Sequence, residues 1–251
     1  MTDYAVFSFQ LDLLLRLIDT TTGTLVTEKI VSLFRNGKRV SAMTKETGQY
    51  LFLNTGREDF ELTVRVAGFE EKRQVVTYET LDQKLPSIDL HLIPSAQSPA
   101  GARCHTLEGT IEGISSIDAA RSSNSACHAK EFDERKRILK VFNPHHLEMD
   151  HIYYALLNLE TGEYERFEIV KRISDQEYKI SKRLEKEFES HFPISRIVFG
   201  EVYPGGRYLL RLPDDSRDAR WLVRMTVNDE DRFYTINCNK PETMQLTKEV
   251  I

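Results

Sequence analysis

Apolar and polar residues alternate along the first part of the chain with a period of two, which is the period of a β-strand. One face of an extended chain between residues 7 and 18 would carry Phe7, Phe9, Leu11, Leu13, Leu15 and Leu17. The other face would carry Ser8, Gln10, Asp12 and Arg16, together with the apolar Leu14 and Ile18. The pattern therefore predicts a strand that is covered in part on both faces.

Similar short apolar segments follow, separated by turn residues. Further strands are expected at 29–34, 48–54, 60–66, 72–78 and 87–93. Asn36-Gly37 is the strongest hairpin signal, because a type I′ turn needs positive φ at both central residues. Strands of this length and spacing predict an antiparallel β-sandwich of the general immunoglobulin-like architecture at residues 1–94.

Several short motifs in this region resemble the carboxypeptidase regulatory-like (transthyretin-like) β-sandwich family. They are Val31–Leu33, Thr44–Phe52 with its Gly-x-Tyr-x-Phe core, Phe60–Val66 followed by Ala67-Gly68-Phe69, and Ile88–Leu92. The chain departs from the family pattern by having Lys45 and Glu46 where an aspartate is usual, and Phe69 where a tyrosine is usual. The resemblance covers residues 10–94 and implies a non-catalytic accessory domain, with no catalytic residues to transfer.

Residues 95–129 have the composition of a linker followed by a polar loop. Pro94–Gly101 is rich in Pro, Ser and Gly, and Ser115–Ala129 offers few large apolar side chains. One short strand is expected at 106–111. We expect 115–129 to be the most mobile interior stretch.

Regular alternation resumes in a second β-rich domain at residues 130–251, a barrel or a second sandwich. Strands are expected at 137–142, 152–159, 164–171, 177–180, 197–203, 208–212, 221–227 and 233–238. Leu184, Phe188 and Phe192 recur every four residues among charges, which predicts one short helix at 182–192 ending before Pro193. The segments 46–50 and 160–164 are nearly identical, which either a domain duplication or convergent hairpin chemistry explains.

Composition limits the classes of function. The 251 residues are 40% hydrophobic and 29% charged, as in globular proteins. A net charge of −5 supplies no basic field for nucleic acid. The apolar segment at 7–18 is interrupted by polar residues and has no basic leader, so neither a signal peptide nor a membrane span is expected. Three cysteines are too few for a disulfide scaffold, and a cytoplasmic origin is expected, compatible with later release as part of an assembly.

Two groups of residues could bind a metal ion. His145, His146 and His151 lie within eight residues together with two carboxylates, but their spacing matches no zinc-enzyme motif, and a solvated loop explains them better. The pairs Cys104-His105 and Cys127-His128 are adjacent residues and therefore poor chelators. No cofactor is expected.

A third group consists of arginines interleaved with aromatic residues on two predicted strands: Arg207, Tyr208, Arg211, Trp221 and Arg224. Such a face on a sheet can bind a glycan or an acidic partner. The alternative is a solvated strand face whose charge is offset by Asp214, Asp215 and Asp218.

The expected function is that of a non-enzymatic structural or adaptor protein. We expect a protein partner, and the sequence is also compatible with a homo-oligomer. Accessory and baseplate parts of phage tails and contractile injection machines have this type of architecture. One alternative is a carbohydrate- or peptide-binding module that uses the Arg/aromatic strands. The other is a metal-dependent enzyme centred on His145–His151.

Overall fold

The computed structural model describes residues 9–27, 31–45, 48–122, 127–142, 147, 153–184, 191–214 and 220–239. The chain divides into two compact units: unit 1 comprises Met1–Asp19 and Leu25–Ser95, and unit 2 comprises Thr20–Thr24 and Ala96–Ile251. In the part of the chain that is described, no helix has the length and apolar character needed to cross a membrane. The fold is mainly β, as the sequence predicts.

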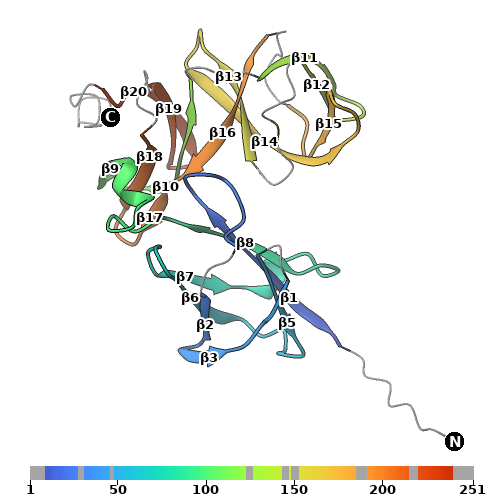
Figure 1. Ribbon diagram of the computed structural model, residues 1–251, viewed down its shortest axis with the longest axis vertical. Coiled ribbons are helices and arrows are strands. Elements are labelled where there is room, and N and C mark those ends of the chain that lie inside the picture. Colours follow the sequence, from blue (N-terminus) through green and yellow to red (C-terminus); the bar gives the residue numbers. More distant parts are fainter. Residues whose placement is uncertain are drawn as a thin grey trace, which may run out of the picture. The chain divides into compact units, whose positions relative to one another are not determined.

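Within its described residues, unit 1 contains two four-stranded sheets that form a sandwich (Figure 1). One sheet has the strand order β4-β5-β1-β8 and the other has the order β3-β2-β6-β7. The bounds are β1 Leu11–Asp19, β2 Val31–Arg35, β3 Lys38–Val40, β4 Met43–Lys45, β5 Gln49–Leu53, β6 Phe60–Val66, β7 Lys72–Val76 and β8 Ser87–Leu92. A 3₁₀ turn, η1 Tyr78–Thr80, lies between β7 and β8.

The alternation in β1 produces the core of unit 1. Leu13, Leu15 and Leu17 are fully buried and belong to one apolar cluster with Leu62 and Val64 of β6. Because alternate side chains of a strand point to one face, this stripe of leucines covers the facing sheet. The strand predictions for β1 and β6 are confirmed.

Two turns follow the predicted chemistry. Asn36 and Gly37 have φ of 47° and 76°, and they join Arg35 to Lys38 in a two-residue hairpin, as type I′ geometry requires. Gly48 has φ of 71° and lies immediately before β5. Tyr50 then packs in the same cluster as Val64 and Val66, which are on the facing sheet.

One pair of strands departs from an all-antiparallel sandwich. β1 is antiparallel to β5 but parallel to β8, in a register from Leu14–Ser87 to Asp19–Leu92. The chain passes from β7 in one sheet through η1 to β8 in the other, so β8 runs in the same direction as β1. Side chains alternate in the same way in both types of pairing, so the sequence pattern could not separate them.

Unit 2 consists of a closed barrel and, beside it, two sheets that pack against each other. The strands are β9 Cys104–Thr110, β10 Ile114–Arg121, β11 Cys127–Asp133, β12 Ile138–Val141, β13 Tyr153–Asn158, β14 Glu163–Arg172, β15 Glu177–Ile180, β16 Pro193–Phe199, β17 Glu201–Tyr203, β18 Arg207–Pro213, β19 Arg220–Val227 and β20 Glu230–Asn237. A 3₁₀ turn, η2 Gly101–Arg103, precedes β9.

The barrel is formed by neighbouring strands in the order β11-β12-β15-β14-β13-β16, and it closes because β16 also pairs with β11 (Figure 1). Tyr154, Phe167 and Tyr178 are at most 2% exposed and belong to its core. The second half of β16 continues into β10, β19 and β20, and β17-β18-β9 forms a separate sheet. Side chains of β18 and β19 share a second core, which includes Leu210 and Met225.

The structure corrects the expected linker and loop at 95–129. Most of this segment is strand, and β10 lies between β16 and β19 in the sheet. Ala119 and Ala120 are fully buried there, because the neighbouring strands supply the large side chains and leave room for only small ones. Scarcity of large apolar residues therefore did not indicate a loop.

The predicted helix at 182–192 falls mostly on residues 185–190, which lie outside the described residues. The described residues on both sides, 181–184 and 191–192, are not helical, and β16 begins at Pro193. His145, His146 and His151 also lie outside the described part of the chain.

Candidate functional site

The five Arg/aromatic candidates do not form an exposed face. Arg207, Tyr208 and Arg211 lie on β18, and Trp221 and Arg224 lie on β19. Arg207 is exposed, and its guanidinium lies 4.6 Å from the centre of the Tyr203 ring. The other four side chains are between 2% and 8% exposed. This burial contradicts the solvent-facing platform that the sequence suggested.

The two aromatic residues of this group are part of the core of unit 2. Tyr208 lies opposite Gly109 on β9, and a Cβ added at Gly109 would lie 2.6 Å from the Tyr208 hydroxyl oxygen. The ring therefore occupies the space that the glycine leaves, a contact known to stabilise sheets. Trp221 packs in the same cluster, and its indole Nε1 is buried with no hydrogen-bond partner among the described residues.

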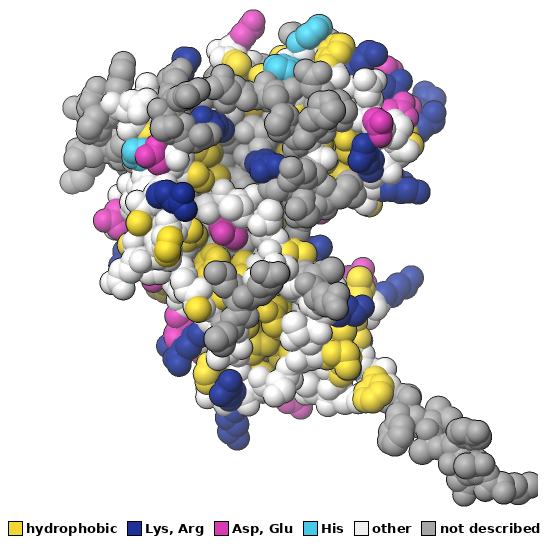
Figure 2. All heavy atoms as spheres, in the orientation of Figure 1, with side chains coloured by type: hydrophobic (Ala, Val, Ile, Leu, Met, Phe, Trp, Pro, Cys, Tyr) yellow, Lys and Arg dark blue, Asp and Glu magenta, His cyan; other side chains and the backbone are white. Residues whose placement is uncertain are grey.

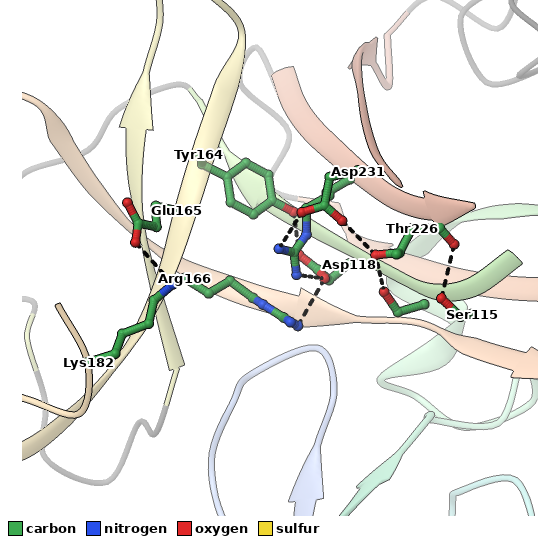
Figure 3. A network of polar contacts seen from close by, with 10 residues as sticks. Ser115, Asp118, Tyr164, Glu165, Arg166, Lys182, Thr226 and Asp231 are labelled. Carbon is green, nitrogen blue, oxygen red and sulfur yellow. Dashed lines mark hydrogen bonds and ion pairs between the residues drawn. The ribbon is translucent and has the colours of Figure 1, made fainter. Parts of the chain in front are cut away.

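Arg224 belongs to a buried polar cluster centred on Asp118, which is fully buried on β10 (Figure 3). The Arg224 Nη2 donates to Asp118 Oδ2 at 2.8 Å, and the Arg166 Nη1 donates to the same oxygen at 3.2 Å. The Tyr164 hydroxyl donates to Asp118 Oδ1. Since Tyr164 and Arg166 belong to β14, the cluster joins the barrel to the strands β10 and β19.

The cluster extends towards the surface through Asp231 on β20. Arg224 Nη1 donates to Asp231 Oδ2 at 3.3 Å, and the Thr226 hydroxyl donates to Asp231 Oδ1 at 2.7 Å. The hydroxyls of Ser116 and Thr226 are 2.8 Å apart. Figure 3 shows these side chains as one connected network. The network thus places the carboxylates of Asp118 and Asp231 against the guanidinium groups of Arg166 and Arg224.

Burial and the charge of Asp118 together set the protonation of the tyrosine and the arginine. Burial, together with the negative charge and the hydrogen bond of Asp118, raises the pKa of Tyr164 well above its usual value. Burial alone would lower the pKa of Arg224, but the negative charge and hydrogen bond of Asp118 outweigh it and raise that pKa. At neutral pH, Tyr164 is therefore a neutral donor and Arg224 is a cation.

This cluster has the features of a structural element rather than a reactive one. Each oxygen of Asp118 is occupied by donors from the protein itself. Sequence reasoning missed Asp118, which lies in the segment taken for a polar loop. The sequence did contain a signal for a buried carboxylate, because Asp118 stands alone between Ile117 and two alanines in a short apolar stretch.

The described residues contain no group of three or more His, Cys, Asp or Glu side chains that could hold a metal ion. Cys127 is 1% exposed, and burial raises the pKa of its thiol to about 12, which disfavours the thiolate that binds metals. The histidine candidates His145, His146 and His151 lie outside the described residues, so their role stays a prediction.

Two surface grooves lie in the described part of unit 1. One, of about 410 Å³, is lined by Ser32, Arg65, Val66, Ala67, Phe69 and Glu71. Arg65 and Arg73 both pair with Glu71, and these hydrogen bonds lower the Glu71 pKa. The other, of about 280 Å³, lies between β7 and β8 and contains Val75, Leu81 and Ile88.

Comparison with known proteins does not identify a family. No protein-family model matches the chain, and no curated protein matches it. A solved structure of a chimeric titin Z1Z2-Z1Z2 tandem carrying a GRGDS peptide from fibronectin aligns over 85% of this chain and 86% of that chain. The identity is 8% and the TM-score is 0.17, so this likeness carries no argument about fold or function.

Proposed function

We propose that this protein is a non-enzymatic structural or adaptor protein that works through protein–protein contacts, as an accessory part of a phage-tail-like or contractile injection assembly. We also propose that unit 1 is a carboxypeptidase regulatory-like (transthyretin-like) domain. Its support is the sandwich itself, with Gly48 at the turn before β5 and with Tyr50 and Phe52 buried in the core.

The observation that carries this proposal is the uneven protection of the four sandwich edges. β3 and β4 are three residues long and contain Lys38, Arg39 and Lys45, and β7 begins with Lys72-Arg73. Short strands and basic side chains are the usual means of preventing an edge from pairing with another chain. β8 has six residues and contains no lysine, arginine or proline.

The negative charge of Asp89 on β8 is also neutralised by an ion pair. Arg16 binds the Asp89 carboxylate with two hydrogen bonds, of 2.6 and 2.7 Å. In the described residues β8 pairs with β1 alone along its length, and just beyond its end Glu70 N–H donates to the Ile93 carbonyl. The groove between β7 and β8 runs beside this edge, and Val75 at its wall is 63% exposed.

An extended segment of a partner protein fits this surface best. Only a strand offers alternating N–H and C=O groups to an open sheet edge, while its apolar side chains can cover Val75 and Ile88. A glycan would leave the apolar wall uncovered. The open edge of β8 supports a role in protein contacts for unit 1, the part of the chain whose family resemblance implies a non-catalytic accessory domain.

The test uses the full chain co-expressed with the products of neighbouring genes. A photo-crosslinking residue at Val75 should capture a defined partner, and size exclusion with light scattering should give a fixed stoichiometry. Val75→Lys should weaken the complex at least about tenfold, since it places a charge in the groove. Leu85→Lys, at an exposed apolar residue outside the groove, is the matched control. A monomer that captures no protein partner would contradict the proposal.

A further inference from the structure

Two lysines face each other on the outer surface of the barrel. Lys171 on β14 and Lys179 on β15 are paired across the antiparallel strands, and both side chains are exposed. Like charges directly opposite each other in a sheet are unfavourable. Neither lysine has an ion-pair or hydrogen-bond partner within the described part of the chain. The fold therefore carries a local electrostatic cost at this position.

A β-bulge creates this arrangement. Ile169 pairs with Ile180, and the register then shifts, so that Lys171 and not Val170 lies opposite Lys179. Without the extra residue, an apolar side chain would face Lys179. Bulges often re-aim side chains at functional positions of a sheet. Here the bulge turns a cross-strand pair with one positive charge into a doubly positive one.

Two acidic residues nearby are engaged with other cations. Asp175 accepts from Arg172 at 2.7 Å, and Glu131 binds Lys140 at 3.0 Å. Glu177 lies on the same strand as Lys179, but it is paired in register with Lys140 on β12. Among the described residues, the lysine pair therefore has no carboxylate partner.

Exposed apolar side chains border the lysine pair. Val170 is 57% exposed and Ile173 is 46% exposed, and both follow the buried part of β14. Figure 2 shows lysine and arginine side chains on the side of unit 2 where Figure 1 places β12 and β15, with acidic and apolar side chains among them. A surface that mixes two cations with two apolar residues suits a polypeptide better than a polyphosphate, which would use the charges alone.

We propose that Lys171, Lys179, Val170 and Ile173 form a docking surface for an acidic segment of a protein partner. The carboxylates of that segment neutralise the lysine pair, and its apolar side chains cover Val170 and Ile173. The proposal rests on the proposed function, since it names the chemistry of one partner contact. Charge complementarity selects the partner: the chain as a whole has a net charge of −5, so attraction of acidic chains is confined to local basic faces such as this one.

The probe is a synthetic peptide of about twelve residues containing glutamate and valine in a ratio of about 2:1. It is titrated into the isotope-labelled full chain at physiological salt. Amide shifts should concentrate at residues 169–173 and 178–180, and binding should weaken as the salt concentration rises. Lys171→Glu with Lys179→Glu should raise the Kd at least about tenfold. Val170→Ser should raise it about threefold, through lost apolar contact.

The control is Lys38→Glu with Lys84→Glu, which makes the same change in net charge in unit 1, where both lysines are exposed. Its Kd should stay within about twofold of the unaltered protein. The single variant Lys171→Glu replaces a like-charge pair with an attractive one, so it should retain or increase the melting temperature while it loses binding. Equal losses in the test and control variants would overturn the proposal.

Two further probes separate this inference from the proposed function. Duplex DNA or phosphatidylserine vesicles that bind through the lysine pair, with no binding of the peptide, would overturn the docking surface and would count against a protein-contact role for this face. No binding of any probe, with a protein partner still captured at Val75, would overturn the docking surface alone. Peptide binding that requires both lysines and Val170 would support it.

Discussion

Asp118 and Arg224 lie directly opposite each other on β10 and β19, and the arginine Nη2 donates to the carboxylate at 2.8 Å. Both side chains are buried, at 0% and 8% exposure. A buried ion pair contributes little net stability relative to apolar residues of the same shape, but removal of one partner leaves an uncompensated charge. The pair, with Tyr164 and Arg166, therefore fixes how β14 of the barrel meets the sheet.

Asp118→Ala should destabilise unit 2 by about 3–5 kcal/mol, because Arg224 would stay buried without its main counter-charge. Urea denaturation followed by the fluorescence of Trp221, the single tryptophan, measures this change. Asp231→Ala is the matched control. The Asp231 side chain is 43% exposed where it binds the same arginine, so it should cost only ~0–1 kcal/mol. Equal effects of the two variants would show that Asp118 does not anchor the network.

Tyr164→Phe keeps the ring, which packs edge-on against Phe233 with centroids 5.3 Å apart, but removes the hydroxyl donor to Asp118. The loss should be about 1–3 kcal/mol, the usual cost of an unmade buried hydrogen bond.

The same variant should change the response to alkaline pH. The folded pKa of Tyr164 is raised by burial, so the native state holds this proton above pH 10, where the unfolded chain releases it. The stabilisation is complete below about pH 10 and is lost as the pH rises towards the folded pKa. Unfolding free energies measured from pH 8 to 11 should therefore fall less steeply in Tyr164→Phe. An unchanged slope would show that this tyrosine does not contribute.

The strands with strict alternation were predictable from sequence, and the long-range pairing was not. β6 and β15 match their predicted ranges, and β1 and β19 match within a few residues, because their own side chains carry the period of two. β10 was missed because its buried positions hold alanines, which give no strong hydrophobic pattern in the sequence. Alanines fit there because the neighbouring strands supply the large side chains. The contact of Asp118 with Tyr164 joins residues 46 positions apart, and no local pattern specifies it.

The corrected position of β10 gives a prediction of its own. Asp118, Ala119 and Ala120 are paired with β16 on one side and with β19 on the other. Their amide protons should exchange only when unit 2 unfolds, whereas those of the short edge strand β3 should exchange through local opening. Limited proteolysis should cut within 96–100, where several side chains are exposed, before it cuts within 114–121. Early cleavage at 114–121 would restore the loop interpretation.

Alanine substitutions at two glycines with positive φ should distinguish the cost of backbone strain from the cost of a steric clash. Gly37, at φ 76°, has no atom within 4 Å of an added Cβ, so Gly37→Ala should cost about 1–2 kcal/mol from conformation alone. At Gly48, φ is 71° and an added Cβ would lie 2.7 Å from the Val26 carbonyl oxygen. Gly48→Ala should therefore destabilise unit 1 by clearly more than Gly37→Ala. Thermal unfolding of the two variants measures the difference, and equal costs would exclude the close approach to Val26.

The three cysteines should differ sharply in reactivity towards a thiol reagent. Cys104 is partly exposed, whereas Cys127 and Cys238 are buried, and burial raises their thiol pKa values to about 12 and about 11. At pH 8 a thiol of pKa near 12 is a thiolate only about one ten-thousandth of the time, and the thiolate is the reactive form. The native protein should therefore show one fast thiol, and Cys104→Ser should abolish that fast phase.

Cys127 should react only at the rate at which the barrel opens, since it packs in the core with Tyr154 and Phe167. All three thiols should react together in urea, and fast reaction of Cys127 in the native state would contradict the closed barrel.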